Sequence, residues 1–172
     1  MSKIKQKRFL DLYQPVHARF EKFCRARAFG DMPYEDLINE TLLIAYKKME
    51  TVKNEKSFLS FLIGISVRIL ANSNRKKKTE SVDEFSVFHN YPDPENLIER
   101  QFEVELLYKA LAKLPEEQRE AIILFEITGF SIKEIMVMQN CGTSAVKQRL
   151  ARGRKKLAEI IKNQLDYLKT TE

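Results

Sequence analysis

Apolar residues in the first 78 positions recur at helical spacing in three successive stretches. Intervals of three and four residues are the period of a helix with one buried face. The first stretch contains Phe9, Leu12, Tyr13, Val16, Phe20, Phe23 and Cys24. Pro15 interrupts it, so the pattern fits either two helices or one kinked helix. Gly30 and Asp31 mark its end.

Two more helices are predicted before residue 78. Pro33 suits a first helical turn, and the apolar stripe after it contains Leu37, Ile38, Thr41, Leu42, Ala45 and Met49. Residues 51–56 are a polar break, and Ser57 is a suitable N-cap for the next helix. Residues 58–70 are apolar nearly all round. Their β-branched residues allow a strand over 61–70, but the length of the run without a turn signal favours a buried helix.

Four helices are predicted from residue 97 onward. They cover about residues 97–113, a second segment that begins at Pro115 and ends at Gly129, then 132–138 and 144–167. Ser131 and Glu134 have the spacing of a capping box. The turn at 139–142 contains Asn140 and Gly142, which both tolerate positive φ, and Thr143 can cap the last helix. A short capped helix, a turn and a longer helix are the layout of a helix-turn-helix.

The last predicted helix separates apolar from cationic positions. One side carries Val146, Leu150, Gly153, Leu157 and Ile160, and the other carries Ser144, Gln148, Ala151, Arg152 and Lys155. Residues 147–156 contain six cations and no acid. Gly153 costs roughly 1 kcal/mol in a helix interior, which predicts close packing against a neighbour. Such a helix fits a DNA major groove, where Gln and Arg read base edges and Lys and Arg neutralise phosphates; a solvated surface helix is the alternative.

Charge divides the chain into three parts. Residues 1–78 have 17 basic and 8 acidic side chains, residues 79–99 have six acids and no base, and residues 100–172 have 13 basic and 10 acidic. The formal charge of +6 therefore combines +9, −6 and +3. We expect an all-α protein of two small helical domains, 1–78 and 100–172, joined by an acidic linker at 79–99. Two basic domains suggest a polyanion as ligand.

Several function classes are disfavoured. No apolar run approaches the 18 residues that a membrane helix needs, and no signal peptide is evident. Cys24 and Cys141 form no Cys-x-x-Cys pair, so reduced thiols in the cytoplasm are expected. His17 and His89 have no partner at ligand spacing, so we expect no metal, no cofactor and no enzyme activity.

Five segments carry a more specific signal. Residues 34–46 read Tyr-Glu-Asp-Leu-Ile-Asn-Glu-Thr-Leu-Leu-Ile-Ala-Tyr, and residues 57–66 read Ser-Phe-Leu-Ser-Phe-Leu-Ile-Gly-Ile-Ser. Residues 110–120 read Ala-Leu-Ala-Lys-Leu-Pro-Glu-Glu-Gln-Arg-Glu, residues 129–135 read Gly-Phe-Ser-Ile-Lys-Glu-Ile, and residues 146–154 read Val-Lys-Gln-Arg-Leu-Ala-Arg-Gly-Arg. In this order they resemble the bacterial RNA polymerase sigma factors of the extracytoplasmic-function (ECF) group, over roughly residues 6–165.

The resemblance implies three groups of binding residues. Core RNA polymerase would be contacted by Asp36, Asn39, Glu40 and Leu43. The -10 element, melted, would be bound by the loop Val52, Lys53, Asn54, Glu55 and Lys56, with Arg68, Asn72 and Arg75 beside that DNA. The -35 element, as duplex, would be bound by Thr143, Ser144, Lys147, Gln148, Arg149, Arg152 and Lys155.

The sequence departs from the family pattern at several of these positions. Phe61 stands for the usual Trp, Asn39 for Gln, Arg68 for Asn and Asn72 for Asp, and the turn at 140–142 reads Asn-Cys-Gly for the usual Gly-Ile-Ser. The function expected is promoter-specific transcription initiation with core RNA polymerase and promoter DNA as partners, an anti-sigma factor as a further candidate partner, and a monomeric free chain. A stand-alone helix-turn-helix regulator and a helical protein-interaction module are the alternatives.

Overall fold

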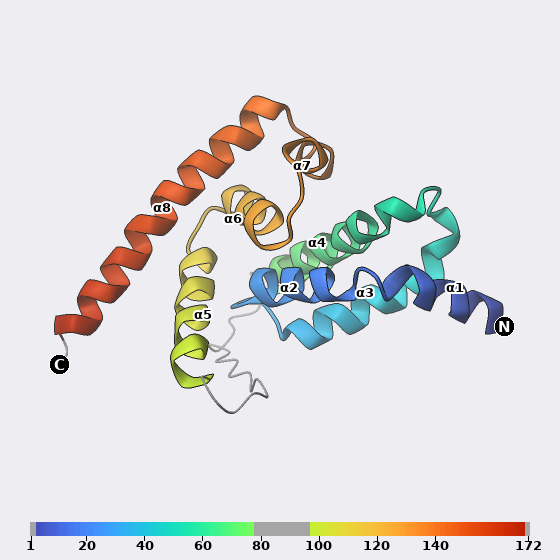
Figure 1. Cartoon of the computed structure of the whole chain (residues 1–172), viewed down its shortest axis with the longest axis horizontal. Helices are drawn as coiled ribbons and strands as arrows, with labels where there is room; N and C mark the ends of the chain where they lie inside the picture. The colour runs from blue at the N-terminus through green and yellow to red at the C-terminus, as the bar shows by residue number, and fades with distance from the viewer. Residues whose placement is uncertain (1–2, 78–96, 171–172) are drawn as a thin grey trace. The chain divides into compact units, whose positions relative to one another are not determined.

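The computed structural model describes residues 3–77 and 97–170, and within those ranges every regular element is a helix (Figure 1). The all-α prediction is confirmed. The chain divides into two compact units, Met1–Phe85 and Ser86–Glu172. Most of the predicted acidic linker lies outside the described residues, and its last three positions, 97–99, begin a helix.

The first unit contains four α-helices in chain order. They are α1 (Lys3–Tyr13), α2 (His17–Ala28), α3 (Tyr34–Lys48) and α4 (Phe58–Lys77), with short 3-10 turns η1 (Met49–Thr51) and η2 (Glu55–Ser57) between the last two. Pro15 lies between α1 and α2, so the first stretch forms two helices rather than one kinked helix. Gly30 takes a φ of +81° in the turn before α3, a conformation that favours glycine.

The core of the first unit is built mainly on the contact between α3 and α4. Its fully buried apolar side chains include Phe20, Phe23, Leu37, Phe58, Leu62 and Leu70. A buried polar pair at this contact is satisfied, because Thr41 Oγ1 and Ser66 Oγ lie 3.0 Å apart and Ser66 also donates to the Leu62 carbonyl. Residues 61–70 are helical throughout, which excludes the strand alternative.

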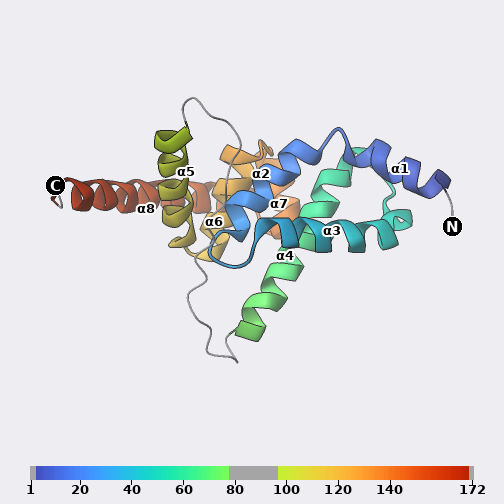
Figure 2. The same cartoon turned by 90° about the horizontal axis from the view of Figure 1, so that it is seen from below.

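The second unit contains α5 (Leu97–Ala112), α6 (Glu116–Ile122), the π-helical turn η3 (Ile123–Ile127), α7 (Ile132–Gln139) and α8 (Thr143–Thr170). Gly129, with a φ of +79°, ends the second segment as predicted. Helix α8 contacts α5, α6 and α7, and in Figure 2 it crosses α5 steeply. The buried apolar side chains of this unit include Leu111, Ala121, Leu124 and Ile135. The unit therefore presents α8 as a long helix supported along one side only.

Candidate nucleic-acid interface

The predicted helix-turn-helix is present as α7, the turn after it and α8, and α7 begins with the expected capping box. The Ser131 side chain accepts from the Glu134 backbone N at 3.2 Å, and the Glu134 carboxylate accepts from the Ser131 backbone N at 2.7 Å. These bonds satisfy two donors at the start of α7 and fix where it begins. The turn after α7 has Asn140 in the left-handed conformation (φ 49°), whereas Gly142 has no positive φ.

The start of α8 differs from the prediction by one residue. Thr143 is the first residue of the helix, and its hydroxyl donates to Met136 Sδ at 2.8 Å. Thr143 thus joins α8 to α7 and is not the cap that was expected. The backbone N of Val146 donates to the Gly142 carbonyl at 3.2 Å, which continues the helical bonding into the turn.

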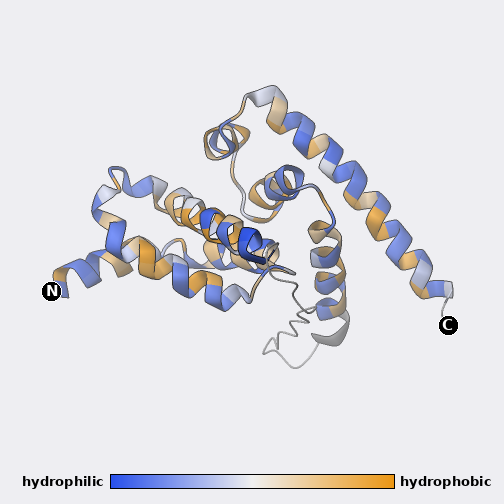
Figure 3. Cartoon of the chain, turned by 180° about the vertical axis from the view of Figure 1, so that it is seen from behind, coloured by the Kyte–Doolittle hydropathy of each residue, from blue (hydrophilic) through white to orange (hydrophobic). Residues whose placement is uncertain are grey.

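The predicted buried side of α8 is confirmed. Val146, Leu150 and Gly153 are buried, and the remaining two apolar positions are half-buried. A Cβ at Gly153 would lie 3.0 Å from Ile122 Cγ1, closer than ordinary carbon contacts. The close packing expected at this glycine is therefore present, between α8 and α6. In Figure 3 hydrophilic and hydrophobic residues alternate along the ribbon of α8, because each turn of an amphipathic helix contains residues of both sides.

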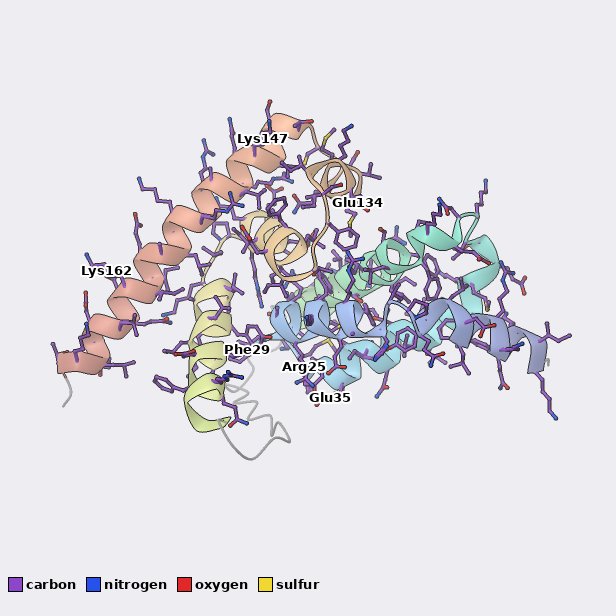
Figure 4. The ribbon with its side chains drawn as sticks, viewed as in Figure 1. Arg25, Phe29, Glu35, Glu134, Lys147 and Lys162 are labelled. Atoms are coloured by element: carbon purple, nitrogen blue, oxygen red, sulfur yellow. The ribbon has the colours of Figure 1, made fainter. Side chains whose placement is uncertain are left out.

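The outer side of α8 is exposed and cationic. Its exposed side chains are Ser144, Lys147, Gln148, Arg152 and Lys155. Among the residues that the structure describes, none forms an ion pair with Lys147, Arg152 or Lys155. Figure 4 shows Lys147 near the start of α8 and Glu134 on α7, the helix before it. Unpaired cations on one face are available to neutralise phosphates.

Two cations of α8 are instead engaged within the protein. Arg154 donates to Glu126 Oε1 at 2.6 and 2.8 Å and lies over the Phe125 ring. The Arg149 side chain is only 19% exposed and its guanidinium pairs with Glu117 at 2.9 Å. Arg149 also donates to the side chains of Gln139 and Cys141. Sequence periodicity places these arginines beside the exposed face but does not reveal the acids that engage them.

The loop predicted to meet melted DNA joins α3 to α4. Val52 is buried and anchors the loop, whereas residues 53–56 are exposed. Asn54, in the middle of the loop, caps the 3-10 turn η2, since its side chain accepts from the Lys56 backbone N at 3.0 Å. Ser57 directly precedes Phe58, the first residue of α4, so it occupies the position predicted for the cap, and its hydroxyl donates to the Asn54 carbonyl at 2.6 Å.

Helix α1 contacts the segment between α3 and α4, and the sequence did not predict these contacts. Lys5 Nζ lies 3.5 Å from Glu50, and an Arg8 guanidinium nitrogen lies 3.8 Å from Glu55. Phe9, on the same helix, packs edge-on against the Phe58 ring with the centroids 5.7 Å apart. The sequence shows that the N-terminus is basic, but it does not predict these ion pairs, because the acidic partners are more than 40 positions away.

Helix α4 carries the other residues predicted to lie beside melted DNA. Arg68, Asn72 and Arg75 are all exposed and recur at intervals of four and three residues, which places them on one stripe. Arg75 donates to Asn72 Oδ1 at 2.7 Å. Phe58 is in the core, as expected, and Phe61 is half-buried beside it.

The predicted polymerase-binding residues share one face of α3. Asp36, Asn39, Glu40 and Leu43 are exposed, and Leu43 exposes 57% of its surface. The opposite face of α3 supplies the buried residues Leu37, Thr41 and Ala45. An isolated exposed leucine is ordinary, but this one extends a polar stripe at positions i, i+3, i+4 and i+7.

Two titration shifts involve residues that are not among the predicted binding residues. Burial raises the pKa of the Cys24 thiol, so this thiol stays protonated at neutral pH. Burial and a hydrogen bond to Glu35 raise the pKa of Tyr34 to about 12, against the opposing effect of Arg25 above its ring. Residues 3–77 and 97–170 contain no group of three metal-ligating side chains, and no helix in them could span a membrane.

Three comparisons with known proteins extend this picture. Residues 105–157 match the family described as sigma-70, region 4. The chain is 26% identical over 151 residues to the ECF RNA polymerase sigma-E factor of Escherichia coli strain K12, covering 81% of this chain and 76% of that protein. It is 28% identical over 127 residues to the ECF RNA polymerase sigma factor EcfG of Rhodopseudomonas palustris, covering 74% and 70%. The fold is similar to that of the sigma factor RpoE from Bartonella quintana, solved in complex with the anti-sigma factor NepR (TM-score 0.71, 24% identity, 89% of this chain and 98% of that chain).

Proposed function

We propose that the chain acts as an RNA polymerase sigma factor of the ECF group, which it resembles in sequence, and that its two helical units divide promoter recognition between them. The C-terminal unit binds the -35 element as duplex, and the N-terminal unit binds core RNA polymerase and the melted -10 element. The observation that carries this proposal is the exposed cationic face of α8, the second helix of a helix-turn-helix whose first helix is capped.

Duplex binding by α8 uses side chains of two kinds. Lys147, Arg152 and Lys155 neutralise phosphates and set the register of the protein on the duplex. Gln148 and Ser144 lie on the same exposed face and are short enough for the helix to approach base edges in the major groove. The α6 and α7 helices support α8 from the opposite side and leave this face open.

Melted DNA is bound by the loop at 52–56 and by the exposed stripe of α4. Extruding a base from the stack costs a few kcal/mol, which contacts to single-stranded DNA can offset. The loop is suited to this because Val52, at its start, is anchored in the protein core while residues 53–56 remain exposed. Arg68 and Arg75 lie along the same helix and attract the backbone of the separated strand.

Core polymerase is bound by the exposed face of α3. Asp36 and Glu40 supply negative charge, Asn39 supplies hydrogen-bonding groups, and Leu43 supplies exposed apolar area. This combination, charge around an apolar contact, is typical of a transient protein interface. An anti-sigma factor is a further partner that we propose, since the RpoE relative has been solved with one. The chain itself carries out no covalent chemistry, and it acts in the cytoplasm, where core polymerase and promoters are found.

In vitro transcription tests this function most directly. The purified chain is added to core RNA polymerase on genomic fragments, and the start sites are mapped. We expect a small set of starts that share -35 and -10 sequences and that require the added chain. Co-purification with core polymerase distinguishes a sigma factor from a stand-alone regulator, which would bind DNA without it. A salt titration excludes a protein-interaction module if the affinity for promoter DNA falls steeply with salt.

A further inference from the structure

Arg149 makes more contacts within the protein than any other cation of α8 in the part of the chain that the structure describes. One guanidinium nitrogen donates to Gln139 Oε1 at 3.0 Å and lies 3.2 Å from Cys141 Sγ, and the other lies 2.9 Å from Glu117 Oε2. Gln139 in turn donates through its amide to the Glu117 carbonyl at 3.1 Å. One arginine of α8 therefore contacts the start of α6, the end of α7 and the turn between α7 and α8.

These contacts use three of the five N–H donors of the guanidinium, so fewer donors remain for a phosphate. The guanidinium has five N–H donors in a fixed plane, and both terminal nitrogens are directed to partners inside the unit. The side chain is 19% exposed, whereas Lys147 and Arg152 on either side are exposed and unpaired. Arg149 is thus placed to hold the helix, and its neighbours are placed to meet DNA.

Few other contacts fix the orientation of α8 near its first turn. Gly153 against Ile122 fixes the separation of α8 from α6 further along the helix. At the start of α8, the turn contributes a single left-handed residue, Asn140, and the Thr143 contact to Met136. The Arg149 network adds the connection from α8 to both α6 and the last residue of α7.

We propose that Arg149 is a positioning residue for -35 recognition: it fixes the orientation of α8 through Glu117, Gln139 and Cys141 and does not neutralise a phosphate. This rests on the proposed role of α8 in -35 binding, and it replaces the DNA-contacting role that the family resemblance implied for Arg149. The arginine orients the helix, and Arg152 supplies charge to the duplex.

Salt dependence separates the two roles. A residue that neutralises one phosphate contributes about 0.9 to the slope of log affinity against log salt, so its removal reduces that slope by about 0.9. Loss of a positioning residue lowers affinity at every salt concentration and leaves the slope unchanged. Removing a hydrogen-bonded charge should lower the affinity on the order of tenfold.

The experiment measures binding of the full chain with core polymerase to a promoter fragment over a series of salt concentrations. Arg149→Gln and Glu117→Gln should each weaken binding with an unchanged slope, and Arg149→Gln with Glu117→Gln should be no weaker than Arg149→Gln alone. Arg149→Lys keeps the charge but not the planar fork, so it should weaken binding as well. Arg152→Gln is the matched control and should reduce the slope.

Alkylation of Cys141 tests the network without DNA. In the free chain, Arg149→Gln and Glu117→Gln should raise the alkylation rate of Cys141, whereas Arg152→Gln should leave it unchanged. Circular dichroism must show native helix content in each variant. A reduced slope for Arg149→Gln, or full binding by Arg149→Lys, would overturn the positioning role. An unchanged slope for Arg152→Gln would instead contradict the proposed -35 function of α8, and the alkylation rates would still decide the role of Arg149.

Discussion

Two helical glycines of this chain should respond in opposite ways to the same substitution. Gly64 in α4 is exposed, and a Cβ built on it meets no atom within 4 Å. Gly153 in α8 is buried, and a Cβ there would lie 3.0 Å from Ile122 Cγ1 and 3.4 Å from Gln118 Cβ. Gly64→Ala and Gly153→Ala therefore add one methyl group to the same backbone conformation in different surroundings.

The magnitudes follow from the contacts. Alanine is more favourable than glycine in a helix interior by about 1 kcal/mol, and Gly64→Ala should gain nearly all of it. At Gly153 the same gain is opposed by the overlap with Ile122, which must move by about 0.5 Å to reach an ordinary carbon contact. Adding atoms to a packed interior costs about 1–3 kcal/mol. We therefore expect Gly64→Ala to stabilise the first unit by about 1 kcal/mol and Gly153→Ala to destabilise the second by a similar amount.

Peptide-resolved hydrogen exchange of the full chain measures both effects. The two units need not unfold together, so a single melting temperature would mix their stabilities. Exchange protection in peptides of α4 and α8 reports the stability of each unit separately. Protection should rise in α4 for Gly64→Ala and fall in α8 for Gly153→Ala, and each variant should leave the other unit unchanged.

A second background shows whether the overlap with Ile122 is the cause. Ile122→Ala removes both side-chain atoms that approach closest to the Cβ position. Gly153→Ala should then become stabilising, because only the gain in helix propensity remains. If Gly153→Ala raised the protection of α8 in the native background, or if Ile122→Ala failed to change its sign, the packing argument would be refuted.

Three further outcomes are expected. Arg152→Ala with Lys155→Ala should abolish transcription that depends on the -35 element and should reduce the salt slope of DNA binding by about 1.8, for two phosphate contacts. Core binding, measured by co-purification, should stay intact, and its loss would count against the proposed role of α8. Asn39→Ala with Glu40→Ala should lower the affinity for core polymerase on the order of tenfold and leave binding of the free chain to -35 duplex unchanged, and normal core affinity would contradict the α3 surface. Exchanging residues 52–56 for the loop of another ECF relative should change the preferred -10 sequence in a promoter library, and an unchanged preference would remove the loop from recognition.

Local patterns in the sequence determined the helices and the surface of α8. The periodicity of Val146, Leu150 and Gly153 is a property of a single helix, so its buried side follows from spacing alone. The capping box at Ser131 and Glu134 is equally local, since both bonds join residues three positions apart. Such signals can be read without knowing the neighbours of a helix, because the same few residues create and satisfy them.

Only the tertiary structure decided which charged side chains are engaged within the protein. Arg149 and Arg152 are three positions apart on one basic helix, yet the acid that pairs with Arg149 is Glu117, more than 30 residues earlier. Periodicity predicts the side of a helix on which a residue lies, but a partner on another helix depends on how the helices pack. The contacts of Lys5 to Glu50 and of Arg8 to Glu55 were decided in the same way, by side chains that meet only after folding.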